Sequence, residues 1–245
     1  MHRIRHQLIL FAFFTLFIIT RLIDISNIEF TFWQSIWVFA VKNSLLLVTF
    51  IYLTYSILNS IRHQSRTGPQ IISGKNLKKT LYPALLLSWL AVAIHTFFEI
   101  SKILLPFNLL PFYQFADFMD ETIAHIFIYV PLIVLVFIIT ILEIERPLSV
   151  NLKKKELTLL SFLSAIAGLF WGLNLTEGRL SLVTSLPAMI ICLIIIGRLF
   201  IKHRLSFLCR PWSLFAFIAA LTGSIAFITW SLIHQSIPEF FTALK

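Results

Sequence analysis

Residues 81–100 read LYPALLLSWLAVAIHTFFEI, an apolar run whose only formally charged side chain is Glu99. At the rise of an α-helix, about 20 residues cross the roughly 30 Å hydrocarbon core of a bilayer. Backbone polar groups find no water there, so such a run must satisfy its own hydrogen bonds as a helix. The run therefore predicts a transmembrane helix, which we place at 82–104.

Six further apolar runs of similar length lie along the 245-residue chain. Hydrophobic residues make up 58% of the sequence and charged residues only 13%, about half the charged share that is typical of soluble domains. We expect membrane spans at 7–25, 36–58, 82–104, 122–142, 157–175, 183–202 and 213–235. These spans take up most of the chain. The expected fold is therefore all-α, a single transmembrane domain over 1–245 built as a bundle of seven helices.

The basic residues gather on alternate connections between these spans, although the net charge of +9 could by itself suggest a nucleic-acid ligand. They are Arg3 and Arg5, then Arg62, Arg66, Lys75, Lys78 and Lys79, then Arg146 and Lys153 to Lys155, and finally Arg198, Lys202, Arg204 and Arg210. By the positive-inside rule, this alternation predicts a cytoplasmic N-terminus and an external C-terminus. We expect an integral protein of a bacterial inner (plasma) membrane, with membrane lipid and not nucleic acid as its partner.

Two polar pairs interrupt the apolar spans: His95 with Glu99, and Glu121 with His125. Each pair is spaced four residues apart and so projects from one face of a helix. Ionisable groups inside a bilayer cost several kcal/mol and persist mainly beside a partner, a metal or water. Because consecutive antiparallel helices are usually neighbours, we expect both pairs at a similar depth below the outer surface.

Two imidazoles and two carboxylates match the ligand preferences of zinc and of non-haem iron. We expect His95, Glu99, Glu121 and His125 as ligands of such a divalent metal, which would lower the pKa of a bound water. Asp120 and Glu121 are the candidate catalytic groups, as a base or as the carboxylate that orients a histidine. Other outer-half residues are candidates for substrate binding: Lys42, Asn43, Asn174 and His234. The leading hypothesis is a metal-dependent, membrane-embedded hydrolase of a lipid or lipid-linked substrate.

Two other functions fit the same residues. A non-enzymatic sensor or transporter could bind an ion, a proton or a small ligand in an outward-facing cavity. A membrane scaffold with another membrane protein as its partner could use the polar pairs only to join helices. The sequence holds no nucleophile elbow, Gly-rich phosphate loop or His-Glu-x-x-His motif, so it does not decide whether the protein is an enzyme.

The run Glu121-Thr-Ile-Ala-His125 resembles the first motif of the seven-span adiponectin-receptor and alkaline-ceramidase superfamily. That resemblance implies zinc bound by histidines and hydrolysis of lipid amides. The chain lacks the superfamily's later Ser-x-x-x-His and His-x-x-x-His elements, and its polar cluster is expected on the opposite side of the membrane. We do not assign the chain to this superfamily.

Two connections and one glycine pair carry further expectations. The segment 60–80 reads as a flexible cytoplasmic loop, broken by Gly68, Pro69 and Gly74. The aromatic segment 105–119, interrupted by Pro106 and Pro111, is expected at the membrane interface as an anchor or a lid. Gly168 and Gly172 are four residues apart, which predicts close contact with another helix of the same chain.

Overall fold

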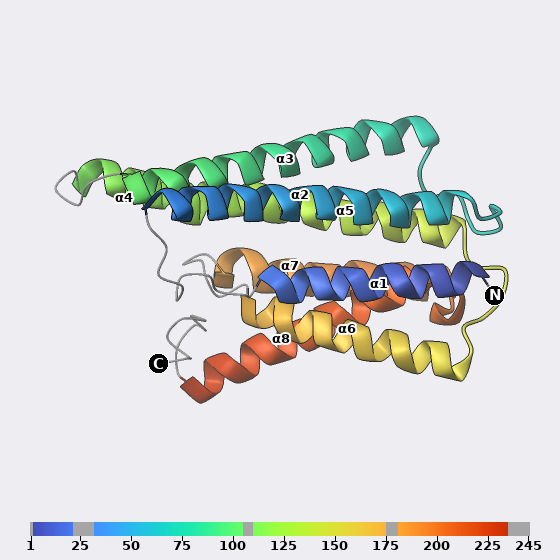
Figure 1. Ribbon diagram of the computed structural model, residues 1–245. Helices are drawn as coiled ribbons and strands as arrows, with labels where there is room; N and C mark the ends of the chain where they lie inside the picture. Colours follow the sequence, from blue (N-terminus) through green and yellow to red (C-terminus); the bar gives the residue numbers. More distant parts are fainter. Residues whose placement is uncertain (1, 22–31, 105–109, 175–180, 235–245) are drawn as a thin grey trace.

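The computed structural model describes residues 2–21, 32–104, 110–174 and 181–234, and Figure 1 shows their arrangement. Within these ranges the chain forms helices joined by short connections, with no β-strand, which confirms the all-α prediction for them. The helices are α1 (His2–Arg21), α2 (Phe32–Arg62), α3 (Gly74–Leu104), α4 (Leu110–Phe118), the π-helical turn η1 (Met119–Ala124), α5 (His125–Glu145), α6 (Lys154–Asn174), α7 (Ser181–Lys202), the 3₁₀ turn η2 (Phe207–Cys209) and α8 (Pro211–His234).

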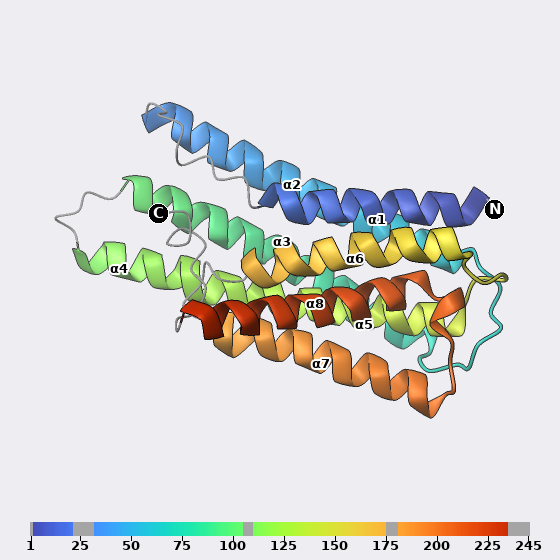
Figure 2. The same cartoon turned by 90° about the horizontal axis from the view of Figure 1, so that it is seen from below.

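Each of the seven predicted spans overlaps one long helix, and these helices run back and forth along a common direction (Figures 1 and 2). The start of α1 and the connections 63–73, 146–153 and 203–210 gather at one end of the molecule, which we call the basic end. The other end, where α3 and α6 finish and α2 begins, is the opposite end. By length and composition, Asn76–Lys102 and Pro211–Ile233 could each cross a bilayer.

Helix α3 begins eight residues before the predicted span, at Gly74, which the sequence suggested as a helix breaker. The side-chain oxygen of Ser73 accepts a hydrogen bond from the backbone N–H of Asn76, 3.3 Å away. Ser73 therefore caps the helix, and the first turn tolerates Gly74 because its N–H needs no intrahelical partner. The polar first turns of α3 carry Lys75, Lys78 and Lys79 beyond the apolar run.

From Leu110 on, the segment before α5 is more helical than the sequence indicated, whereas residues 105–109, with Pro106, lie outside the described part of the chain. Helix α4 continues through η1 directly into α5. The expectation that Pro111 interrupts helical structure here is therefore wrong. Proline is compatible with the first turn of a helix, and Pro111 is the second residue of α4. Asp120 and Glu121 consequently lie in a π-helical turn and not at the start of a new helix.

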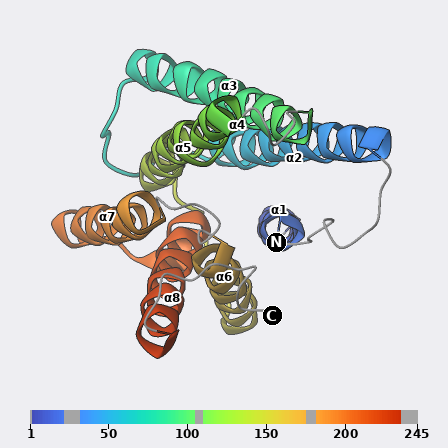
Figure 3. The ribbon, with the colours of Figure 1, turned by 90° about the vertical axis from the view of Figure 1, so that its left-hand side faces the viewer.

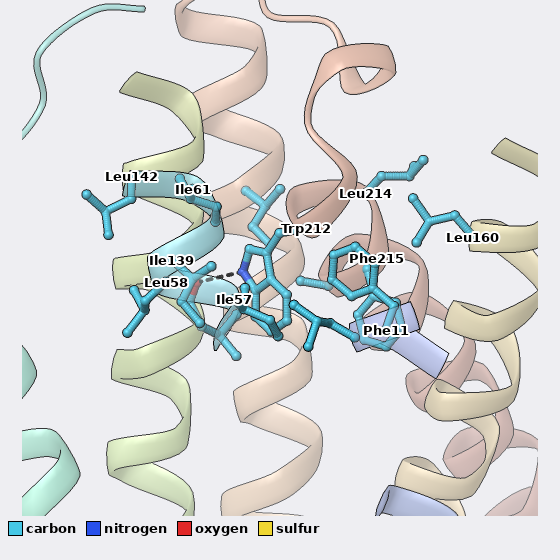
Figure 4. Packing of buried hydrophobic residues seen from close by; sticks show 14 of the residues in the cluster. Phe11, Ile57, Leu58, Ile61, Ile139, Leu142, Leu160, Trp212, Leu214 and Phe215 are labelled. Atoms are coloured by element: carbon cyan, nitrogen blue, oxygen red, sulfur yellow. Dashed lines mark hydrogen bonds between the residues drawn. The ribbon is translucent and has the colours of Figure 1, made fainter. Parts of the chain in front are cut away.

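The long helices form two groups, seen end-on in Figure 3. Helices α2, α3 and α5 pack together in the first group. In the second group, α6 packs against α1 and α8, and α7 packs against α8, while α1 also contacts α2. Trp212 lies at the junction, where its indole N–H donates to the carbonyl of Val136, 3.3 Å away (Figure 4). Phe11 stacks on Phe215 with ring centroids 5.1 Å apart. The hydrogen bond and the ring contact join α1, α5 and α8 into one core.

Helices α6 and α8 approach each other closely because small residues meet where they cross. A Cβ atom added to Gly168 would lie 2.8 Å from the Cα of Ala219, and one added to Gly172 would lie 2.8 Å from the Cα of Gly223. Side chains at these positions would force the two backbones apart. The prediction that Gly168 and Gly172 form an internal helix contact is confirmed.

The outer surface of the bundle is apolar along much of its length. Large hydrophobic side chains are exposed on most of the long helices, among them Phe97 (63%) on α3, Ile194 on α7 and Leu232 (74%) on α8. Soluble proteins rarely expose large contiguous apolar patches, because each buries such surface in a core or an interface. The exterior therefore supports membrane association.

Candidate functional site

The helices that carry the two polar pairs lie side by side. Helix α3, with His95 and Glu99, contacts both η1, which holds Glu121, and α5, which begins at His125. His95 lies past the midpoint of α3, toward the opposite end. The expected proximity of the two helices is confirmed, and their backbones bring the four positions into the same half of the molecule.

The side chains of this set are described for one member only. His95 is half-buried on α3, whereas the side chains of Glu99, Asp120, Glu121 and His125 lie outside the described part of the chain. Among the side chains that the structure does describe, no three His, Cys, Asp or Glu groups lie close enough to hold a metal ion. The zinc or iron site thus stays a prediction.

The four predicted substrate-binding residues also lie toward the opposite end. Lys42 and Asn43 are in the first half of α2, which begins there, and Asn174 and His234 are the last residues of α6 and α8. Their side chains are not among those described. The role of these residues in substrate binding stays a prediction.

The π-helical turn is the distinctive backbone feature beside these residues. It covers Met119–Ala124 and so includes Asp120 and Glu121. Single π-helical turns within α-helices are uncommon and often occur at functional sites. Close by, the ammonium of Lys102 lies 3.4 Å from a carboxylate oxygen of Asp117, an ion pair that joins the end of α3 to α4.

Sequence reasoning missed a set of buried polar contacts at the basic end. Glu143 is 1% exposed, and its carboxylate caps the start of α8. One oxygen accepts from the N–H of Trp212, and the other accepts from the N–H and the hydroxyl of Ser213, each at 2.7 Å. Carboxylates favour helix N-termini because unpaired N–H groups and the helix dipole meet there. Glu143 is thus an N-cap supplied by a different helix.

Glu143 lies one residue beyond the predicted span 122–142. Burial raises the pKa of its carboxyl to about 7, opposed by the hydrogen bonds from Ser213 and Trp212 and by the positive charge of Arg210. Arg210 is itself buried, donates to the carbonyl of Ser206 at 2.8 Å, and lies over the ring of Phe200, 5.9 Å from its centroid. A buried carboxyl group, of Glu143, and a buried guanidinium group, of Arg210, thus lie near each other where α8 begins.

Glu145, the last residue of α5, forms hydrogen bonds with the connection between α2 and α3. Its side chain accepts hydrogen bonds from the N–H groups of Ile71 (2.7 Å) and Ile72 (2.9 Å) and from the guanidinium of Arg66 (3.2 Å). Its backbone carbonyl accepts from the N–H of Gly68 at 3.0 Å. The expectation of a flexible loop is therefore not supported for residues 66–72.

The other connections of the basic end are joined in the same way. Arg146 donates to the carbonyls of Arg62 (2.9 Å) and Gln64 (3.0 Å), which caps the end of α2. The N–H of Leu148 donates to the carbonyl of Cys209, and that of Leu152 to the carbonyl of Leu208. These contacts join three connections into one network at the basic end.

Comparison with known protein families, with curated proteins and with solved structures finds no match for this chain. The functional argument therefore depends on the chain's own residues.

Proposed function

We propose that the protein crosses the bacterial inner membrane seven times, with the basic end in the cytoplasm and the opposite end outside. The apolar exterior of the long helices supports this arrangement, because exposed residues such as Phe97 and Leu232 need a hydrocarbon solvent. The alternation of helix direction gives the same support, since it places the basic connections together at one end.

We further propose that the outer half of this bundle holds a divalent metal and hydrolyses a lipid or a lipid-linked substrate. The observation that carries the proposal is the packing of α3 against η1 and α5, which brings the helix segments bearing His95, Glu99, Glu121 and His125 side by side. The π-helical turn at Asp120 and Glu121 adds support.

Each residue has a role in this proposal. His95, Glu99, Glu121 and His125 hold zinc or iron, and Asp120 accepts a proton or orients a histidine. A metal of this kind supplies a water of lowered pKa as the nucleophile. In this proposal, Lys42 and His234 bind the polar head group of the substrate, and Asn43 and Asn174 donate hydrogen bonds to it.

Metal analysis of the protein purified without added metal tests the proposal. We expect about one equivalent of zinc or iron in the wild type, lost in His95→Ala and in His125→Ala. The matched control is His203→Ala, at the basic end, which should retain the metal. Loss of metal from the control variant as well would contradict the assigned site.

The remaining outcomes favour the other functions. A folded wild type without stoichiometric metal removes the hydrolase and favours a sensor or transporter that binds an ion, a proton or a small ligand. Failure of the His95→Ala and His125→Ala variants to accumulate, beside a normal His203→Ala control, favours structural pairing in a scaffold.

A further inference from the structure

A shallow groove of about 510 Å³ opens on the outer face of α6, close to the basic end. It is lined by Lys154, Lys155, Thr158, Leu159 and Phe162. These residues fall at intervals of three and four positions along the first turns of α6, so they share one helix face. Phe162 is 62% exposed although it is a large aromatic residue.

The chemistry of the groove changes along the helix axis. Two lysines lie at its start, Thr158 lies one turn further, and the apolar side chains of Leu159 and Phe162 lie beyond that, so most of the lining is hydrocarbon. Thr158 donates its hydroxyl hydrogen to the carbonyl of Lys154, 3.0 Å away, which leaves the oxygen as an acceptor. Cationic residues followed by apolar side chains match the order of phosphate and acyl chains in a phospholipid.

The groove faces away from the rest of the bundle. The buried side of α6 consists of Leu160, Ser164 and Ala167, and Gly168 contacts α8. The carboxylate of Glu156 is turned to the helix start, where it accepts a hydrogen bond from the N–H of Lys153 at 2.8 Å. The groove face itself carries no acidic residue among the residues that line it.

The charges described at the basic end are distributed unequally between surface and interior. Its carboxylates are engaged within the molecule: Glu143 and Glu145 are buried, and Glu156 bonds the backbone. Its cations are largely exposed: Arg5, Arg62, Lys78, Lys79, Lys153, Lys154, Lys155, Arg198, Lys202 and Arg204. The surface of this end is therefore complementary to an anionic layer.

We propose that the groove of Lys154, Lys155, Thr158, Leu159 and Phe162 binds one anionic phospholipid of the inner leaflet. The two lysines bind the phosphate, and Leu159 and Phe162 contact the start of an acyl chain. The inference rests on the membrane insertion proposed above, and it concerns the end of the molecule away from the metal site.

Native mass spectrometry of the detergent-purified protein with added phosphatidylglycerol or phosphatidylcholine tests the site. The wild type should retain phosphatidylglycerol preferentially. A Lys154→Ala/Lys155→Ala double variant should bind it about 10- to 30-fold more weakly, the effect expected of two lysines at an anionic surface. The matched control is Lys78→Ala/Lys79→Ala, another exposed lysine pair at the basic end, which should keep the preference.

Three results would overturn the proposal: equal retention of the two lipids, an equal loss in the control pair, or displacement of the lipid by excess inorganic phosphate. The last would indicate a site for small anions. Flotation of the wild type with vesicles of phosphatidylcholine alone tests insertion separately, and metal content tests the opposite end. Failure of the lipid site is thus distinguishable from failure of the proposed function.

Discussion

The two ends of the molecule use polar residues differently. At the basic end, Glu143, Glu145 and Arg146 bond backbone groups of other segments, so their charges hold connections in place. At the opposite end, the polar residues interrupt apolar helices: His95 and Glu99 on α3, and Glu121 in the π-helical turn. Polar groups that cap helix ends stabilise the fold directly, whereas ionisable groups within apolar segments are costly in a bilayer unless they lie beside a partner, a metal or water.

This difference distinguishes charges that cap helix ends from charges that lie within apolar helices. A buried carboxylate with backbone donors gains its stability from the donors and needs no ligand. The experiments below test how strongly each end depends on its own kind of contact.

The largest effect is expected from Glu143→Ala. The substitution leaves the N–H groups of Trp212 and Ser213 buried without their acceptor and Arg210 without its neighbouring acid, so we expect a loss of about 3–5 kcal/mol of unfolding free energy. Denaturant titration in detergent measures it. Glu156→Ala is the control, because its bond to Lys153 lies at the surface and should cost about 1 kcal/mol or less. Equal losses of unfolding free energy in the two variants would contradict the larger stabilisation that we assign to the buried cap.

A smaller loss of unfolding free energy is expected where α6 and α8 cross, toward the opposite end. The two helices contact each other there through their backbones and not through a carboxylate. Gly172→Ala places a methyl group against the backbone of Gly223 and should cost about 1–3 kcal/mol. Gly197→Ala is the matched control on α7, where an added Cβ meets nothing within 4 Å, and it should be neutral or stabilising. Similar losses in both variants would mean that the crossing tolerates side chains.

A further effect is a dependence of stability on pH at the basic end. The pKa of the Glu143 carboxyl is about 7 in the folded protein and near 4.5 in the unfolded chain. Between these two pH values the folded state keeps a proton that the unfolded state releases. Stability from this group is therefore present at pH 4 and is lost as the pH rises through 7. Unfolding midpoints from pH 4 to 8 should fall more steeply in the wild type than in Glu143→Gln. A Glu156→Gln control should keep the wild-type slope, and an unchanged slope in Glu143→Gln would contradict the assignment.

The helices were predictable because apolar runs of membrane length leave the chain few alternatives. Each predicted span overlaps a helix, and the contact at Gly168 and Gly172 follows from small residues at helical spacing. The boundaries were harder. Whether Gly74 breaks or begins a helix depends on the cap at Ser73, and the effect of Pro111 depends on its place in the first turn.

The polar contacts of the basic end were not predictable from local pattern. Glu143 bonds Trp212, 69 residues later, and Glu145 bonds Ile71, 74 residues earlier. Glu143 and Glu145 stand at the end of an apolar run, where acidic residues are usually exposed to solvent. Because they are two residues apart, they lie on different sides of α5. The order Glu143-Ile-Glu145-Arg146 was the available signal, but nothing nearby in the sequence names the partners.

The most direct test of the account is whether the two ends face different sides of the membrane. In a Cys209→Ser background, in which Cys192 is buried, single cysteines replace Ser65 at the basic end and Gln114 on α4, both exposed. A membrane-impermeant maleimide should label Gln114→Cys in intact cells and Ser65→Cys only after the membrane is opened. Labelling of both in intact cells, or of neither, would contradict the seven-span arrangement.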